Sequence, residues 1–300
     1  MKAYGNPESL ARAEQQVLFE VSADGIARIT LNRPEKHNAM TVPMRSRLMA
    51  LIQQCDLDEH ERVVVIKVHG KSICSGNEIN EDWGQRAPGQ KRMTLSMASR
   101  YAGDLNYGRH GFSQALTRCA KVTLLQLHGY CAAAAYFMIA TRCDLVFVNP
   151  SSKIGALEAR FLGPAGAVSA VHINRILGTK AARRYGYTGA AMSGEDALRL
   201  GLAHRCVAEE NMQAEVDALA ARIAARPARL LAYSKARIRA AESLYQTNVR
   251  EVSGLLFSHF LQADHDEAHF WTQVKKSGVG GALVADKARL AAATRPAGTT

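Results

Sequence analysis

Residues 26–40 read IARITLNRPEKHNAM, a strand-like stretch that runs into a turn. Residues 26–31 alternate in the manner of a half-buried strand, and the Asn-Arg-Pro at 32–34 ends it, because proline carries no backbone N–H for a strand ladder. A second β-rich run, at 17–21, precedes it across Ser-Ala-Asp-Gly at 22–25, and Asp-Gly is a hairpin signal. The segment therefore predicts a β-hairpin that leads into a basic turn.

Downstream, strand-like and helix-like segments alternate. Apolar residues at helical spacing predict a helix over 42–55 with Thr41 as its N-cap. Short apolar runs predict buried strands at 63–68, 122–127 and 145–148, and a helix is expected within 96–119. This alternation predicts an α/β core over 16–214. From Glu215 the pattern is helical, with helices expected over 216–225, 228–243 and 249–262 in a C-terminal region that ends at 286. Residues 287–300 are expected to be a disordered tail.

The composition is that of a globular protein with a basic surface. Of the 300 residues, 47% are hydrophobic, and no apolar run approaches the roughly 20 residues of a membrane helix. A polar N-terminus and six cysteines without a CxxC pair or a metal-like spacing predict a cytoplasmic protein with reduced thiols and no metal site. The net charge of +11 favours polyanions, including a phosphate-rich cofactor. Because the cations are spread along the chain, nucleic-acid binding is not the favoured interpretation.

Six segments in order carry a resemblance to one family. The strand and turn at 26–40 are similar to the entry segment of the crotonase (enoyl-CoA hydratase/isomerase) superfamily. Further matches are GKSICSGNEI, HGYC, CDLVF, KIG and the block YTGAAMSGEDALRLGL, at 70–79, 128–131, 143–147, 153–155 and 187–202. The resemblance implies a ββα superhelix core with a C-terminal helical trimerisation region, and a homotrimer or hexamer. It also implies an acyl-CoA substrate, with coenzyme A as part of that substrate and no separate cofactor.

Members of this family stabilise the enolate oxygen of a thioester with two backbone N–H groups, which form an oxyanion hole. By motif, these donors are the N–H groups of Asn77 and Ala134. The sequence departs from the family's Gly-Gly-Gly, because residues 133–135 are all alanine. A Cβ restricts the backbone and narrows the approach of the thioester. The alternative is that this stretch is only a close-packed helix start.

Hydratases of the family hold water with two glutamates. With the family's usual spacing, a count forward from Gly129 places the first glutamate at Phe137. A count back from Asp144 places it at Met138. Neither residue is acidic, and the counts differ because the segment is one residue longer than the usual pattern. The second acid matches Glu158, although a count back from Gly163 selects Ala159. Beside an acyl pocket, burial would raise the pKa of such a carboxyl toward a range useful for proton transfer. The alternative is an exposed Glu158 or one paired with Arg160.

The resemblance also suggests contacts with coenzyme A. Arg33 and Lys36 could meet its phosphates, or could be solvated charges, and Phe270 and Lys275 are approximate matches to C-terminal residues that complete the site. His69 and His128 are more readily explained as structural residues than as bases. Enoyl-CoA hydratase is the first expectation, with a 3,2-enoyl-CoA isomerase using Glu158 alone as the rival. Hydrolysis, a non-catalytic CoA-binding role and RNA binding also stay open.

Overall fold

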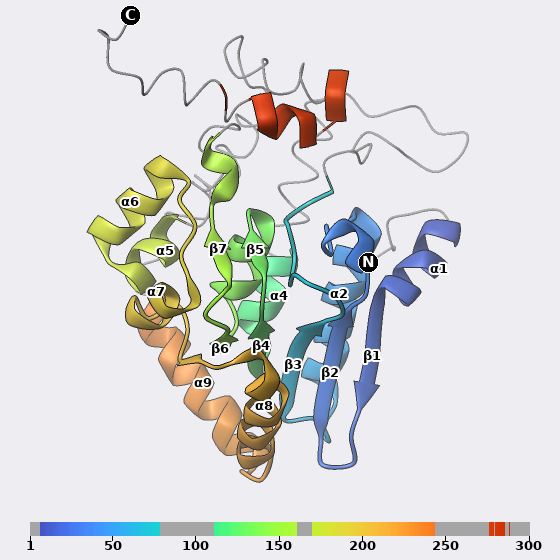
Figure 1. The fold of residues 1–300 in the computed structure, drawn as a ribbon. Helices are drawn as coiled ribbons and strands as arrows, with labels where there is room; N and C mark the ends of the chain where they lie inside the picture. The colour runs from blue at the N-terminus through green and yellow to red at the C-terminus, as the bar shows by residue number, and fades with distance from the viewer. Residues whose placement is uncertain are drawn as a thin grey trace, which may run out of the picture.

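The computed structural model describes residues 7–78, 111–160, 170–243, 276–278, 280–285 and 288. Within them the chain forms a six-stranded sheet in the order β1-β2-β3-β4-β6-β8. These strands are Val17–Val21, Ile26–Leu31, Val63–Val68, Val122–Leu127, Leu145–Val148 and Arg205–Cys206. β1 is antiparallel to β2, and the remaining pairs are parallel (Figure 1). A separate two-stranded sheet pairs β5 (Tyr130–Ala132) with β7 (Lys153–Gly155). The predicted hairpin and the three predicted buried strands are confirmed to the residue.

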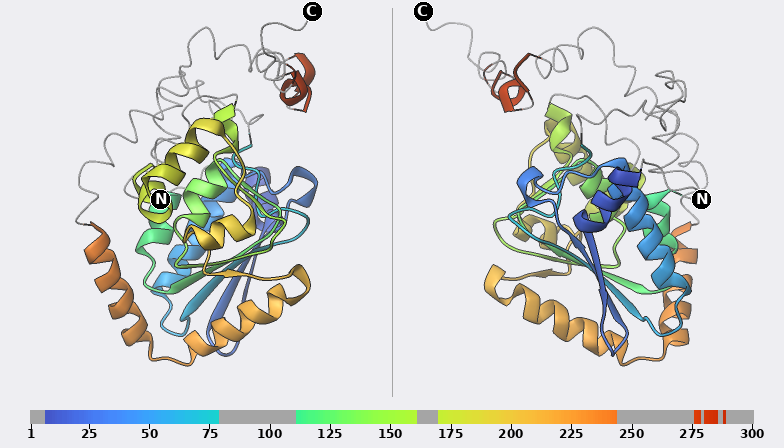
Figure 2. Two further views of the ribbon diagram at one scale, coloured as in Figure 1. Left: turned by 60° about the vertical axis from the view of Figure 1, so that its left-hand side comes forward. Right: turned by 90° about the vertical axis from the view of Figure 1, so that its right-hand side faces the viewer.

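The sheet is buried on both faces, which explains why its parallel strands are nearly continuous apolar runs. Successive residues alternate between two cores: Val64, Ile66 and Leu125 face one, while Val63, Val65 and Leu124 face the other. The first core packs under α2 (Val42–Leu57) and α4 (Phe112–Arg118), and the second under α8 (Glu209–Ala224). Figure 2 shows the sheet between α2 and α8.

The helix predicted over 42–55 is α2, and its cap is confirmed. The Thr41 side chain accepts a hydrogen bond of 3.3 Å from the Met44 N–H, which satisfies one of the free donors of the first turn. A helix that the sequence did not predict, α1 (Pro7–Gln16), packs on α2. Of the helix expected within 96–119, the described part is α4, which ends at Arg118; the rest lies outside the described residues.

The C-terminal half of the described chain is helical. α5 (Ala170–Leu177), α6 (Thr179–Thr188) and α7 (Gly194–Arg199) lie on the β7 side of the molecule, and α8 and α9 (Ala228–Ser243) follow (Figure 1). α8 starts at Glu209 and packs on four strands, so it belongs to the core. The helix expected over 249–262 and the tail from 287 fall outside the described residues, apart from residue 288. No helix in the described ranges is long and apolar enough to cross a membrane.

Candidate active site

The loop after β3 and the short strand β5 (Tyr130–Ala132) run side by side at the carboxyl end of the sheet. Cys74 donates its backbone N–H to the Tyr130 carbonyl at 3.0 Å, and Ala132 donates to the Cys74 carbonyl at 3.1 Å. On its other edge the loop is bonded to Met40, which accepts from the Glu78 N–H at 2.9 Å. Ligands of parallel α/β sheets bind at the carboxyl ends of the strands, so this pair of segments is the place to seek a site.

Gly76 brings the two predicted donor segments into contact. Its φ of +114° is a conformation that residues with a Cβ rarely adopt. A Cβ built on Gly76 would lie 2.9 Å from the Ala133 Cβ and 3.6 Å from the Ala134 nitrogen. Only a residue without a side chain lets the loop approach the turn this closely. The structure therefore places Asn77 and Ala134 in adjacent segments.

The backbone directions suit two convergent donors. Met40 is hydrogen-bonded to the Gly76 carbonyl and to the Glu78 N–H, the groups on either side of Asn77. Because backbone N–H groups alternate in direction along an extended segment, the Asn77 N–H points to the opposite edge of the loop. That edge faces β5 and the turn after it. Ala134 stands in the first turn of the following helix, where N–H groups have no acceptor within the helix. The positive end of the helix adds to the attraction for an anion there.

Two arginines hold the loop that carries Asn77. Arg45, which is fully buried, donates one bond of 3.2 Å to the Met40 carbonyl and one of 2.5 Å to Asn77 Oδ1. Arg33 forms an ion pair of 3.0 Å with Glu78. It also donates to the Ala39 carbonyl at 2.8 Å. These contacts fix the backbone on both sides of the Asn77 N–H.

The turn after β5 is made with alanine in a conformation that favours glycine. Ala133 has a φ of +50°, and its N–H donates to the Gly155 carbonyl at 3.1 Å. The segment that follows is the π-helix η2 (Tyr136–Ala140), in which the Thr141 N–H reaches back five residues to the Tyr136 carbonyl. A π-turn is how a helix accommodates one extra residue, so it accounts for the extra residue noted in this stretch.

The π-turn also explains the two counts for the first acid. The Phe137 N–H still makes an ordinary helical bond to the Ala133 carbonyl, at 3.1 Å. Phe137 therefore precedes the extra residue in the helix. For this reason the count forward from Gly129 gives the correct position for the first acid, and that position is Phe137. The Phe137 side chain is buried and carries no proton to transfer.

Glu158 is a buried carboxylate on the 3₁₀ helix η3 (Leu157–Arg160), which directly follows β7 (Lys153–Gly155). Its exposure is 6%, and neither carboxylate oxygen has a hydrogen-bond partner among the described residues. Burial raises the pKa of Glu158 to about 7. Arg160 turns away and donates to the Gly189 carbonyl at 2.7 Å. The alternative of an exposed Glu158, or of one paired with Arg160, is therefore wrong.

Comparison with known proteins decides the family. The sequence profile of the family described as enoyl-CoA hydratase/isomerase matches residues 22–273. The chain belongs to the enoyl-CoA hydratase/isomerase family. The α/β fold agrees: a crystal structure of enoyl-CoA hydratase from Mycobacterium smegmatis superposes with a TM-score of 0.76, at 26% identity, covering 91% of this chain and 94% of that one.

Two curated relatives show the same likeness at sequence level. The mitochondrial enoyl-CoA hydratase domain-containing protein 3 of Xenopus laevis is 27% identical over 210 residues, which are 66% of this chain and 63% of that protein. The probable enoyl-CoA hydratase EchA14 of Mycobacterium tuberculosis is 30% identical over 223 residues, covering 73% of this chain and 79% of the relative. These likenesses agree with the family membership and the fold.

Within this family member, the residues suggested for coenzyme A have different surroundings. Lys36 is exposed at the end of the 3₁₀ helix η1 (Pro34–Lys36) and is available to a ligand. The Arg33 side chain is only 13% exposed and is held by Glu78, so its part in CoA binding stays a prediction. Phe270 and Lys275 lie outside the described residues. In the ranges described, no three His, Cys, Asp or Glu side chains gather as a metal site requires.

The two histidines near the site make structural hydrogen bonds. The His128 Nε2 lies 2.7 Å from the Gly70 carbonyl oxygen, and the His69 Nδ1 lies 3.1 Å from Asn32 Oδ1.

Two further residues near the site were not predicted from the sequence. Arg45 lies among the apolar positions of α2, and its importance to the site becomes visible only from its contact with Asn77. Tyr136 is buried, and burial is the main cause that raises the pKa of its hydroxyl, with smaller contributions from Cys131 and then Glu158.

Proposed function

We propose that this protein moves a proton on an acyl-CoA thioester, with Glu158 as its single acid–base residue. The observation that carries this proposal is the isolation of Glu158: a buried carboxylate with a pKa of about 7 and, among the described residues, no hydrogen-bond partner. A base with such a pKa is half ionised near neutral pH, where it can both accept and return a proton.

Glu158 is linked to the donor segments through the backbone. β7 pairs with β5 in parallel, with Ala132 opposite Gly155. The Ala133 N–H then donates to the Gly155 carbonyl, three residues before Glu158. The turn that offers the Ala134 N–H is thus bonded to the end of β7, the strand that leads into the 3₁₀ helix with Glu158. This arrangement supports one site with two backbone donors and one carboxylate.

The reaction that this arrangement supports best is isomerisation of a 3-enoyl-CoA to a 2-enoyl-CoA. The Glu158 carboxylate removes a proton from C2, and the electron pair of that C–H bond moves toward the thioester carbonyl, giving a dienolate. The Asn77 and Ala134 N–H groups stabilise the oxyanion. The protonated Glu158 then delivers the proton to C4, while the double bond forms between C2 and C3. Atoms and charge balance without a second acid.

Hydration of a 2-enoyl-CoA, the first expectation from the sequence, is the second candidate. It is supported by the names of the relatives, which contain the words enoyl-CoA hydratase. Addition of water in this family uses two acids, and the position of the first is taken here by the buried Phe137. Hydration would therefore need a different group to hold the water.

The test is turnover of a 3-enoyl-CoA and a 2-enoyl-CoA by the wild-type protein, Glu158→Gln and Glu61→Gln. Glu61 is a matched control, because it is also a buried glutamate, 2% exposed, but lies before β3 at the opposite end of the sheet. We expect isomerisation that falls by at least about 100-fold in Glu158→Gln and persists in Glu61→Gln. Faster conversion of the 2-enoyl substrate to a hydroxyacyl product would favour hydration.

Two results would reject the catalytic proposal. If both substrates bind and neither reacts, a non-catalytic CoA-binding role is left. If salt-sensitive RNA binding occurs without any effect of CoA, the RNA-binding alternative is left. We also propose a homotrimer or hexamer, as the resemblance implies, and light scattering that gives the mass of a monomer, 32.6 kDa, would reject it.

A further inference from the structure

The alanine at position 133 has a backbone conformation that residues with a side chain rarely adopt. Its φ is +50°, in the left-handed region, where a Cβ crowds the backbone and glycine is the ordinary choice. Hydrogen bonds hold the residue there. The Ala133 N–H donates to the Gly155 carbonyl, and the Ala133 carbonyl accepts from the Phe137 N–H, each at 3.1 Å. A methyl group kept at a strained position beside the proposed site calls for a functional explanation.

The Ala133 side chain is also the accessible one in its stretch of four alanines. Ala132, Ala134 and Ala135 are buried, with exposures of 7%, 6% and 0%, whereas Ala133 is partly exposed. Both backbone polar groups of Ala133 already have partners. What this residue can offer to a bound molecule is therefore its methyl group.

This methyl group lies at one end of the gap between the two donor segments. Gly76 directly precedes Asn77, and Ala133 directly precedes Ala134. A Cβ built on Gly76 would lie 2.9 Å from the Ala133 Cβ, so these two preceding residues face each other. Because a peptide N–H lies in one plane with the Cα of the residue before it, an oxygen bound by both N–H groups borders Gly76 and Ala133. Gly76 brings no side chain there, so the Ala133 methyl narrows the space beside the oxygen.

The proposed reaction brings a part of the substrate close to that oxygen. When Glu158 removes a proton from C2, a partial double bond forms between the thioester carbon and C2. The two groups that stay on C2 then lie in the plane of the thioester, one on the side of the oxygen and one on the side of the sulfur. In an unbranched acyl chain, the group beside the oxygen can be a hydrogen atom. If C2 carries a methyl substituent, both groups are carbon, so one of them must approach the Ala133 methyl.

We propose that the Ala133 methyl determines specificity, restricting this site to acyl-CoA thioesters that are unbranched at C2. This inference rests on the proposed function of Glu158 and deepens it by naming the substrate class. It assigns a role to a side chain that neither binds the oxyanion nor moves a proton.

The test is the initial rate of isomerisation of but-3-enoyl-CoA and of racemic 2-methylbut-3-enoyl-CoA, which differ by one methyl group on C2. Ala133→Gly removes the side chain at a φ that glycine adopts freely. Ala133→Ser keeps a Cβ at the same place. Ala135→Gly is the matched control, because it makes the same change two residues further on, where the side chain is fully buried in the core. Thermal unfolding shows that each variant is folded.

We expect kcat/KM of the wild type to be lower for the branched substrate by roughly 10-fold or more, because a methyl group is forced into a filled space. In Ala133→Gly the two substrates should differ by less than about 3-fold, since the space is opened. Ala133→Ser and Ala135→Gly should keep the preference of the wild type.

Three results would overturn the inference while the proposed function stands. The first is equal turnover of the two substrates by the wild type, and the second is an unchanged preference in Ala133→Gly. The third is a preference that is lost equally in Ala135→Gly, because this would show only a loosened turn. If neither substrate reacts, the proposed isomerisation is wrong and the inference falls with it.

Discussion

The guanidinium of Arg45 donates a 2.5 Å hydrogen bond to Asn77 Oδ1, joining the first turns of α2 to the loop after β3. Asn77 is thereby held by its side chain while its backbone N–H faces the turn at Ala134. A fully buried arginine is costly to place, and here it fixes the one loop whose position the proposed oxyanion hole requires.

Replacing Arg45 should affect both stability and rate. Arg45→Met keeps the length and loses the donors, so Asn77 Oδ1 and the Met40 carbonyl lose a buried partner, at a cost of about 1–3 kcal/mol in the free energy of unfolding. We expect kcat on the preferred acyl-CoA to fall roughly 10-fold, with KM changing less, because a misplaced N–H donor mainly reduces the stabilisation of the transition state. Urea unfolding and steady-state kinetics measure the two effects.

The control for this prediction is Arg47→Met. Arg47 lies on the same helix but bonds to the Val17 carbonyl and pairs with Glu14, away from the loop. An Arg45→Met enzyme with wild-type kcat would show that the bond to Asn77 serves stability alone.

Glu158 should make both stability and activity depend on pH. Its pKa rises from 4.5 to about 7 on folding, so the folded protein binds this proton more tightly than the unfolded chain. The resulting stabilisation is fully present below about pH 4.5 and is lost as the pH rises through about 7. Glu158→Gln stays neutral, so we expect it to exceed the wild type in stability by about 3 kcal/mol at pH 8 and to match it near pH 4.

The activity should rise with pH over the range in which the stabilisation by Glu158 is lost. The base form of Glu158 starts the reaction, so kcat/KM of the wild type should rise with pH through about 7 and then level off. Unfolding curves and initial rates across pH 4–9 test both statements. A stability difference that does not change with pH would contradict the burial of Glu158.

Gly76 should not tolerate a side chain. Gly76→Ala places a Cβ 2.9 Å from that of Ala133 at a φ of +114°. We expect a loss of about 1–3 kcal/mol in stability, and a fall in kcat/KM, because the two donor segments are pushed apart. Gly186→Ala in α6 is the control: its Cβ would meet nothing within 4 Å, and it should stabilise the helix by about 0.5–1 kcal/mol. Equal effects in differential scanning calorimetry would disprove the close approach.

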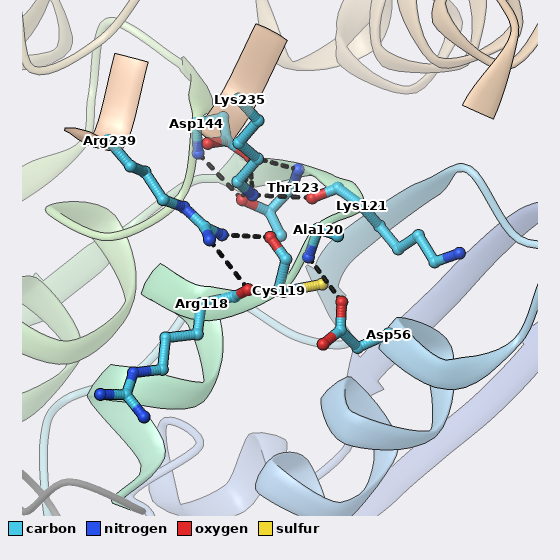
Figure 3. A network of polar contacts seen from close by, with 9 residues as sticks. All are labelled: Asp56, Arg118, Cys119, Ala120, Lys121, Thr123, Asp144, Lys235 and Arg239. Atoms are coloured by element: carbon cyan, nitrogen blue, oxygen red, sulfur yellow. Dashed lines mark hydrogen bonds and ion pairs between the residues drawn. The ribbon is translucent and has the colours of Figure 1, made fainter. Parts of the chain in front are cut away.

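Lys235 should be an anchor for α9. Lys235→Met removes the ammonium that donates to Asp144 and to the Lys121 carbonyl, while Asp144 keeps its two hydrogen bonds from Thr123 (Figure 3). We expect a cost of about 1–3 kcal/mol in the free energy of unfolding. Lys180→Met, at an exposed position of α6, should change the free energy of unfolding by less than about 0.5 kcal/mol. Chemical denaturation of the two variants, side by side with the wild type, measures the difference.

Some parts of the fold follow from short stretches of sequence. The hairpin at 17–31 needs only alternating residues and an Asp-Gly turn, and the start of α2 needs only Thr41 in front of an apolar helical pattern. In each case the decisive hydrogen bonds join residues near each other in the chain. α1 was not predicted, because a polar ten-residue helix is stabilised by its packing on α2 and not by its own pattern.

In the candidate site too, some features could be predicted from the sequence and others depend on the tertiary structure. The resemblance in the sequence predicted the family, which the family profile over residues 22–273 confirms. By motif it also predicted the two donor positions and Glu158, and these roles stay predictions. Only the tertiary structure decided that Phe137 stands before the π-turn, since an inserted residue can be located only from the five-residue bond that absorbs it. The roles of Arg45 and the burial of Glu158 were decided there too, because contacts and desolvation come from residues distant in the chain.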